Sequence, residues 1–291
     1  LSPIDVITLI FTAWIMVYMA VGYKRVEGFG FHFACYLSIF AGVILSAYLE
    51  RLWEGREGRF YCVYRFLRGL YPVLLFGYFY TSNHSFNRVL ITTWQDPLFI
   101  EADRAIFGYL PSLVWGVKYN HWLISELFHF AYFCYYPMIV GLPVYLWLKD
   151  RKAFEELIFV LSFSFYIFYF IYSLFPTIGG RYFDEALIRT KLYRAGPFTH
   201  IMAFIYNNSK HWGGAFPSSH LGIAVVLTVA ALAHPHTRKM GYVFAAVSLI
   251  MSFSIAYCHY HWFVDALGGI AVGIGSFFLG RWTYKKMLEN R

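Results

Sequence analysis

A polar stretch at residues 213–220, with the sequence GGAFPSSH, carries residue types that can bind and protonate an anion. Its paired glycines allow the backbone to approach a ligand closely. If a helix begins at Pro217, free N–H groups and the hydroxyls of Ser218 and Ser219 point out of its end and form an anion site. His220 would then lie in the first turn, where an imidazole can exchange a proton with the anion. Taken alone, the stretch is equally compatible with a glycine turn before an ordinary helix.

His261 and Asp265 form a second candidate pair, because residues four apart on a helix lie on the same face. The carboxylate can hold one imidazole N–H, which leaves the other ring nitrogen available as a nucleophile or base. A metal site built from His220, His259, His261 and Asp265 is an alternative. We disfavour it because a phosphate cradle and a nearby arginine would be superfluous beside zinc. We therefore expect neither a metal ion nor a cofactor.

The composition indicates an integral membrane protein. Of the 291 residues, 59% are hydrophobic and only 14% are charged, whereas soluble domains carry about 25% charged residues. The aromatic content of 22% fits interfacial belts and an aromatic interior. We attribute the formal net charge of +8 to basic cytoplasmic loops and an anionic substrate, not to nucleic-acid binding.

The apolar runs predict an all-α, polytopic helix bundle of about eight membrane spans in a single domain, residues 1–291. Residues 1–60 would supply two extra N-terminal spans, and residues 61–291 would form a six-helix catalytic core. The expected spans cover residues 6–23, 29–49, 64–80, 123–148, 154–175, 217–234, 241–257 and 261–280. In the last span, Gly269 and Gly273 predict close helix packing.

Residues 94–108 have an amphipathic pattern and predict a helix that lies in the membrane interface and ends at Gly108. Glu101, Asp103 and Arg104 would form its water-facing side, without a catalytic role.

Glu126 and His129 lie three residues apart in the fourth span. Ionisable residues in a span are candidates for function, but nothing near them suggests chemistry. We expect them to pair with each other and fix packing. Pro137 and Pro143 are expected to kink this span.

The basic residues predict the orientation. Eight spans place both termini on one side, and most of the 24 Lys and Arg residues lie in short loops or span ends on that side. Short basic loops mark the cytoplasm, so the termini would be cytoplasmic. The 213–220 stretch, Arg181 and His261 would then share the opposite face, toward a periplasm, a lumen or the exterior. Three polar features from distant stretches meeting at one face favour a functional site.

These residues resemble the motifs of the type 2 phosphatidic acid phosphatase superfamily. The second motif of that family, Pro-Ser-Gly-His, is similar to residues 217–220, with Ser219 in the glycine position. The third motif, in which Ser-Arg precedes a His and an Asp four residues apart, resembles the stretch from Ser254 to Asp265, with Ile255 in the arginine position.

The first motif is less well preserved. Arg181 looks like its arginine, while Leu174 stands at the lysine position and Tyr182 at the proline position. The missing third-motif arginine, residues 175–177 and residues 103–108 all look like the branch that contains inositol phosphorylceramide synthase.

The resemblance implies a role for each site residue. His261 would attack phosphorus and form a phosphohistidine, Asp265 would orient it, and His220 would protonate the leaving oxygen. The phosphoryl oxygens would be held by Arg181, Ser218, Ser219 and the Gly214 backbone. Apart from the resemblance, any of four residues could supply further positive charge: Lys191, Lys210, His211 or His259.

A phosphate monoester carries nearly two negative charges and a diester carries one. A site that lacks two of the family's cations suits a diester better, so we predict a lipid phosphotransferase that moves a phospho-headgroup between lipid substrates in the bilayer. A lipid phosphate phosphatase is the close alternative. A lipid transporter or flippase is a third possibility, which we disfavour because the polar residues cluster at one face and no internal repeat is visible.

Overall fold

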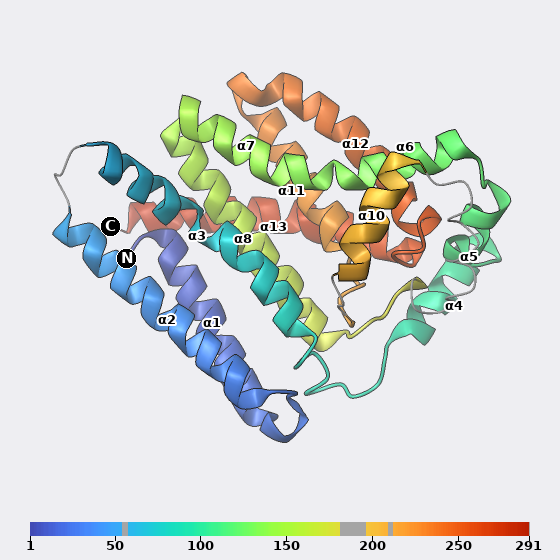
Figure 1. Cartoon of the computed structure of the whole chain (residues 1–291), viewed down its shortest axis with the longest axis horizontal. Coiled ribbons are helices and arrows are strands. Elements are labelled where there is room, and N and C mark those ends of the chain that lie inside the picture. The colour runs from blue at the N-terminus through green and yellow to red at the C-terminus, as the bar shows by residue number, and fades with distance from the viewer. Residues whose placement is uncertain (54–57, 181–195, 209–211, 291) are drawn as a thin grey trace.

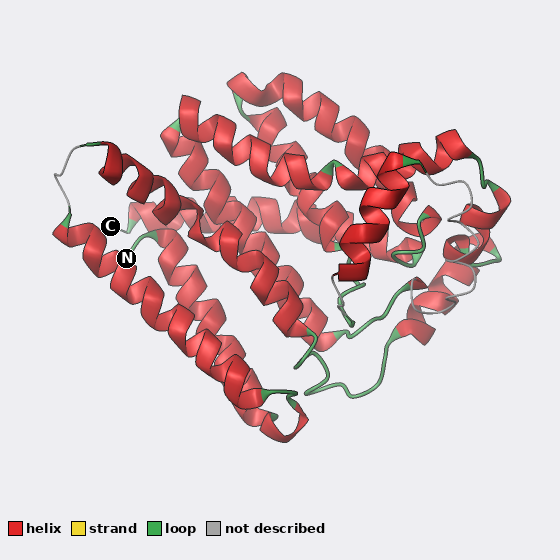
Figure 2. Ribbon diagram, in the orientation of Figure 1, coloured by secondary structure: helices red, strands yellow, loops and turns green. Residues whose placement is uncertain are grey.

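The computed structural model describes residues 1–53, 58–180, 196–208 and 212–290, which form helices joined by loops with no strand among them (Figure 1, Figure 2). This confirms the prediction of an all-α bundle. The longer helices are α1 (Pro3–Val21), α2 (Phe29–Leu52), α3 (Arg59–Asn83), α8 (Arg151–Leu174), α12 (Arg238–Tyr257) and α13 (Phe263–Glu289). The shorter ones are α4 (Asp96–Phe107), α5 (Pro111–Lys118), α6 (Trp122–Phe133), α7 (Tyr135–Lys149), α10 (Pro197–Asn208) and α11 (Ser219–Ala233), with single turns η1 (Tyr23–Arg25) and η4 (Pro235–Thr237).

Six helical segments of the described chain are long and apolar enough to cross a membrane. They are α1, α2, α6 with α7, α8, η4 with α12, and α13. The other two predicted spans correspond to α3, which carries Arg65 and Arg68 in its first half, and to α11, which has only 15 residues. A helix of that length extends about 22 Å, less than the ~30 Å hydrocarbon core of a bilayer.

The short helix α11 lies at the centre of the bundle and packs against α7, α8, α12 and α13 (Figure 1). Leu221, Ile223, Ala224, Val226 and Leu227 are all fully buried. A helix that is apolar on all its faces is stable where other helices cover it on every side. The uninterrupted apolar sequence of α11 therefore accounts for its central place, and its first residues are held rigidly where the site forms.

Helix α13 crosses α11 at close range through two glycines. A Cβ atom at Gly273 would lie 2.5 Å from the carbonyl oxygen of Gly222, and one at Gly269 would lie 2.5 Å from that of Ser218. The predicted close packing is confirmed. The crossing fixes the first turn of α13, which contains Asp265, against the residue that precedes α11.

We expect Gly273→Ala to lower the thermal stability of the protein in detergent, because the new methyl group would meet backbone and force the two helices apart. The expected loss is about 1–3 kcal/mol, as for other overpacked cores. Gly275→Ala is the matched control, since a Cβ atom there has nothing within 4 Å. Equal melting temperatures for the two variants would contradict the tight crossing.

The N-terminal helices α1 and α2 form a hairpin at one side of the bundle (Figure 1). Helix α1 is tied to the core by a buried ion pair in which Arg68 Nη2 lies 2.6 Å from Asp5 Oδ2. The Tyr71 hydroxyl donates a further hydrogen bond to Asp5. Helix α2 buries only Tyr36, Val43 and Ala47 and thus lies farther out.

The predicted fourth span is broken into α6 and α7 at Cys134, which ends the first helix and begins the second. A proline lacks the N–H that would bond to the carbonyl four residues earlier, and its ring clashes with that carbonyl. For Pro137 this carbonyl belongs to Phe133, so the break falls where Pro137 places it. Pro143 lies inside α7 without interrupting it.

Candidate active site

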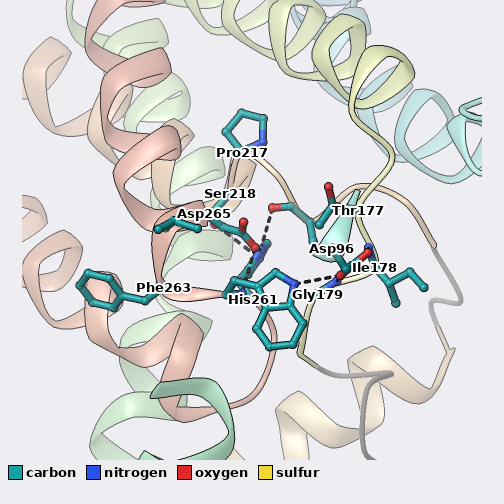
Figure 3. Close-up of polar contacts among 12 residues, drawn as sticks. Asp96, Thr177, Ile178, Gly179, Pro217, Ser218, His261, Phe263 and Asp265 are labelled. Carbon is teal, nitrogen blue, oxygen red and sulfur yellow. Dashed lines mark hydrogen bonds and ion pairs between the residues drawn. The ribbon is translucent and has the colours of Figure 1, made fainter. Parts of the chain in front are cut away.

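The site forms where the loop before α11 meets the start of α13 (Figure 3). Ser218 is the N-cap of α11, and the helix begins at Ser219, so the prediction of a helix from Pro217 is wrong by two residues. The Ser218 N–H donates to the Asp265 carbonyl at 3.0 Å and is therefore not available to an anion, contrary to expectation. Its hydroxyl points instead toward His261.

His261 is oriented through its Nδ1 atom, which lies 2.8 Å from the Ala215 carbonyl oxygen and 3.3 Å from Asp265 Oδ2. Both groups accept hydrogen bonds, so Nδ1 carries the proton and Nε2 is the unprotonated ring nitrogen. Nε2 lies 3.4 Å from the Ser218 hydroxyl oxygen (Figure 3). The predicted His261–Asp265 pair is thus present, and it shares the imidazole with a backbone carbonyl that sequence reasoning did not find.

Burial makes this arrangement rigid. His261 is 5% exposed, and Ser218 and Asp265 are fully buried. Asp265 Oδ2 also accepts the Trp262 N–H at 3.0 Å, which holds the carboxylate in the first turn of α13. The arrangement leaves Nε2 as the ring nitrogen with nucleophilic character, beside the Ser218 hydroxyl.

His220 lies in the first turn of α11, partly buried among tyrosine rings. The centroid of its ring is 4.6 Å from that of Tyr135 and 5.0 Å from that of Tyr132, and Tyr80 and Tyr136 lie at 6.5 and 6.4 Å. Burial among these rings and the nearby His261 disfavour a charged imidazole, so a negatively charged ligand beside His220 is needed to favour the imidazolium. Sequence reasoning missed these tyrosines, although three of them cluster at residues 132–136.

The position of Asp103 differs from the prediction. It was expected to face water, but it is fully buried and accepts the N–H groups of Phe263 and Val264, each at 2.9 Å. The first N–H groups of a helix have no partner within the helix, and Asp103 satisfies two of them at the start of α13. Burial raises the pKa of Asp103, while the two N–H groups oppose that rise. Glu101 and Arg104 are exposed, as predicted.

Asp96 is a second buried carboxylate on α4 that sequence reasoning missed. Its Oδ2 accepts the Ile178 N–H at 2.9 Å, and its Oδ1 accepts the Gly179 N–H at 2.9 Å and the Trp262 indole N–H at 2.8 Å (Figure 3). Asp96 and Asp103 are seven residues apart, which places them on one helix face two turns apart. That spacing, with Phe99 between them, is the signal that could have identified the inner face.

Two sets of hydrogen bonds hold the loop from Thr177 to Gly180 beside the site. Asp96 holds its backbone from α4, and Thr177 forms a bridge with Gly214, with the Ala215 N–H donating to the Thr177 carbonyl at 3.0 Å. Gly214 therefore lies next to the site, and the N–H of the residue after it is already bonded to Thr177. Its role in binding phosphate stays a prediction. Four of the expected phosphate-binding or supporting residues lie outside the described residues: Arg181, Lys191, Lys210 and His211.

Three further residues considered in the sequence lie in the protein interior. His259 is 1% exposed, and its Nδ1 contacts the Ser112 carbonyl of α5, so this nitrogen faces α5. Ser254 donates to the Phe128 carbonyl at 2.7 Å, and Ile255 is fully buried. Among the described residues, no group of three or more His, Cys, Asp or Glu side chains could hold a metal ion.

Glu126 fixes α10 to α6. Its carboxylate accepts the N–H groups of Gly196, Phe198 and Thr199 at 2.8–3.1 Å and the Thr199 hydroxyl at 2.5 Å. Glu126 therefore has the predicted packing role, but it fulfils that role by capping the start of α10 and not chiefly by pairing with His129. The Nδ1 atom of His129 donates to the Ser125 carbonyl at 2.7 Å.

Comparison with known proteins identifies one family. The model of the PAP2 superfamily matches residues 98–279. The match begins in α4 and ends in α13, and it therefore includes Asp103, the loop before α11 and the start of α13, whereas Asp96 lies two residues before it. No curated protein and no solved structure matches the chain.

Proposed function

Given that this chain belongs to the PAP2 superfamily, we propose that it is a lipid phosphotransferase embedded in the membrane, which moves a phospho-headgroup from one lipid to another. The superfamily and the helical membrane architecture are consistent with either a lipid phosphatase or a phosphotransferase. The observation that carries the proposal is the orientation of His261, whose Nδ1 is bound and whose Nε2 faces the Ser218 hydroxyl.

In the first step, the Nε2 lone pair of His261 attacks the phosphorus of the donor lipid. A P–N bond forms and the P–O bond to the leaving alcohol breaks, while a protonated His220 gives its proton to the leaving oxygen. Asp265 and the Ala215 carbonyl stabilise the positive charge that develops on the imidazole through its Nδ1–H. The product is a phosphohistidine and a free lipid alcohol.

In the second step, the now neutral His220 removes the proton of an acceptor alcohol, whose oxygen attacks phosphorus. The P–N bond breaks and His261 returns to its starting form. The Ser218 hydroxyl is placed to donate to a phosphoryl oxygen as its charge grows. If water takes the place of the acceptor alcohol, the same steps give a phosphatase.

The charge of the site supports transfer over monoester hydrolysis. Ile255 stands at the position of a family arginine and is fully buried, so no cation approaches from that position. A diester with one negative charge needs less compensation than a monoester with nearly two. The resemblance to inositol phosphorylceramide synthase further supports a sphingolipid alcohol as acceptor. We also propose that the site faces the non-cytoplasmic side, with the termini in the cytoplasm.

Two assays of the purified protein distinguish the activities. A phosphodiester lipid supplied with a lipid alcohol should yield a new phospholipid, and a phosphate monoester lipid should release little inorganic phosphate. Rapid phosphate release without any exchange of headgroup would establish the phosphatase instead. An acid-labile phosphoryl group on His261, detected by mass spectrometry of the quenched enzyme, is expected in either case.

A further inference from the structure

A cavity of about 740 Å³ lies at the end of the bundle opposite the candidate active site. Helix α13 connects the two places, because Asp265 lies at its start and Tyr284, near its end, lines the cavity. These residues are separated by about 28 Å of helix, close to the ~30 Å thickness of the hydrocarbon core. Both chain termini lie at the same end as the cavity (Figure 1).

The cavity has an apolar part and a charged part. The apolar part is deeply buried, with Phe154, Ile158 and Phe159 each no more than 2% exposed. The charged part contains Arg51, Arg65, Arg68, Glu50 and Glu155. Its volume is within the ~300–1,000 Å³ that ligand sites commonly have, and this division suits a ligand that is itself amphiphilic.

Arg68 is the buried arginine of the charged part. It is 7% exposed, and its guanidinium is held by Asp5 at 2.6 Å, with Glu50 at 3.5 Å from its Nε. The Nε atom is buried without a hydrogen bond to any described residue. The Glu50 carboxylate offsets part of the charge without completing a hydrogen bond to this donor, and a phosphate oxygen in the cavity would supply that hydrogen bond.

Charges of both signs remain at the rim. Arg51, Arg65 and Glu155 are exposed, and none of the three forms an ion pair within the part of the chain that the structure describes. Arg68 is compensated by Asp5 and Glu50, which leaves two arginines and one glutamate at the rim. A ligand that matches it carries both a negative and a positive group.

We propose that this cavity binds a phospholipid whose headgroup carries a phosphate and a primary ammonium, with an acyl chain against the apolar lining. The arginine guanidinium groups match the geometry of phosphate oxygens, and the Glu155 carboxylate accepts hydrogen bonds from the ammonium. A purely anionic headgroup would offer the Glu155 carboxylate no cationic partner. This lipid is distinct from the substrates at His261.

The test measures binding to the whole purified, delipidated protein in detergent. An ethanolamine phospholipid should remain bound in native mass spectrometry and raise the melting temperature more than an anionic glycerol phospholipid, whereas soluble phosphoethanolamine at equal concentration should not. Arg65→Gln should weaken ethanolamine-lipid binding about tenfold, the loss expected for one charged hydrogen bond. Lys285→Gln, an exposed cation at the same end that does not line the cavity, is the matched control and should bind normally.

A second variant tests the ammonium contact. Glu155→Gln should remove the preference for the ethanolamine lipid over the anionic lipid while total lipid binding persists. The proposal is overturned if the wild type binds the two lipids equally, if Arg65→Gln binds as well as Lys285→Gln, or if soluble phosphoethanolamine binds as tightly as the lipid. Lipid exchange at His261 is measured separately, so failure of this proposal leaves the proposed function untouched.

Discussion

His261→Ala is expected to reduce phosphoryl transfer by about 10⁴-fold or more, because it removes the nucleophile and with it the covalent intermediate. His220→Ala should cause a loss of similar size with a lipid donor, since the leaving alkoxide then has no proton donor. Turnover of the purified variants with a headgroup donor and a lipid alcohol measures both effects.

An activated donor separates the two roles. With a nitrophenyl phosphodiester, the leaving group departs without protonation, so His220→Ala should still form the phosphohistidine in a single burst. His261→Ala should form none. Melting temperatures close to that of the wild type are the control for folding in both variants. A phosphorylated enzyme in His261→Ala would refute the assignment of the nucleophile.

Asp103→Asn is expected to lower kcat by about 100-fold with little change in KM. The carboxylate accepts two N–H groups at the start of α13, whereas an amide offers one oxygen and turns its own N–H₂ toward a donor. A displacement of about 1 Å of the adjacent His261 is enough for a loss of this size. The burst rate of phosphohistidine formation measures it directly.

Glu101→Gln is the matched control, because Glu101 lies on the same helix and is exposed. It should have wild-type kcat and KM. Asp103→Asn acts through the position of His261, so its burst should slow while the acceptor specificity is unchanged. A normal burst rate in Asp103→Asn would show that Asp103 only stabilises the fold.

Local patterns allowed much of this site to be predicted. The pairing of His261 with Asp265 follows from helical spacing alone, and the close packing at Gly269 and Gly273 follows from small residues one turn apart. The all-α architecture follows from the long apolar runs, although α11 proved too short to meet the length of a span. In each case the neighbours in sequence determine the outcome.

The parts that sequence reasoning missed depend on tertiary contacts. The Ala215 carbonyl that binds His261 lies 46 positions away in the chain, and Asp103 reaches α13 from 160 positions away. An amphipathic pattern with charges at residues 101, 103 and 104 is most simply explained by a solvated face. Only the docking of α4 onto the start of α13 makes Asp103 a buried acceptor.

The shortness of α11 has a consequence for how a substrate reaches the enzyme. A helix of about 22 Å is several ångströms shorter than the ~30 Å hydrocarbon core, so we expect at least one of its ends to lie within the bilayer. Ser218 and His220 stand at the N-terminal end of this helix, so we expect them to lie below the membrane surface and not in the water above it when the bundle is embedded in a bilayer. A lipid can therefore present its phosphate by moving sideways within its leaflet, with its chains still in the bilayer. Turnover is accordingly expected to depend on the acyl-chain length of the surrounding lipids, since bilayer thickness sets the height of the phosphate plane relative to His261.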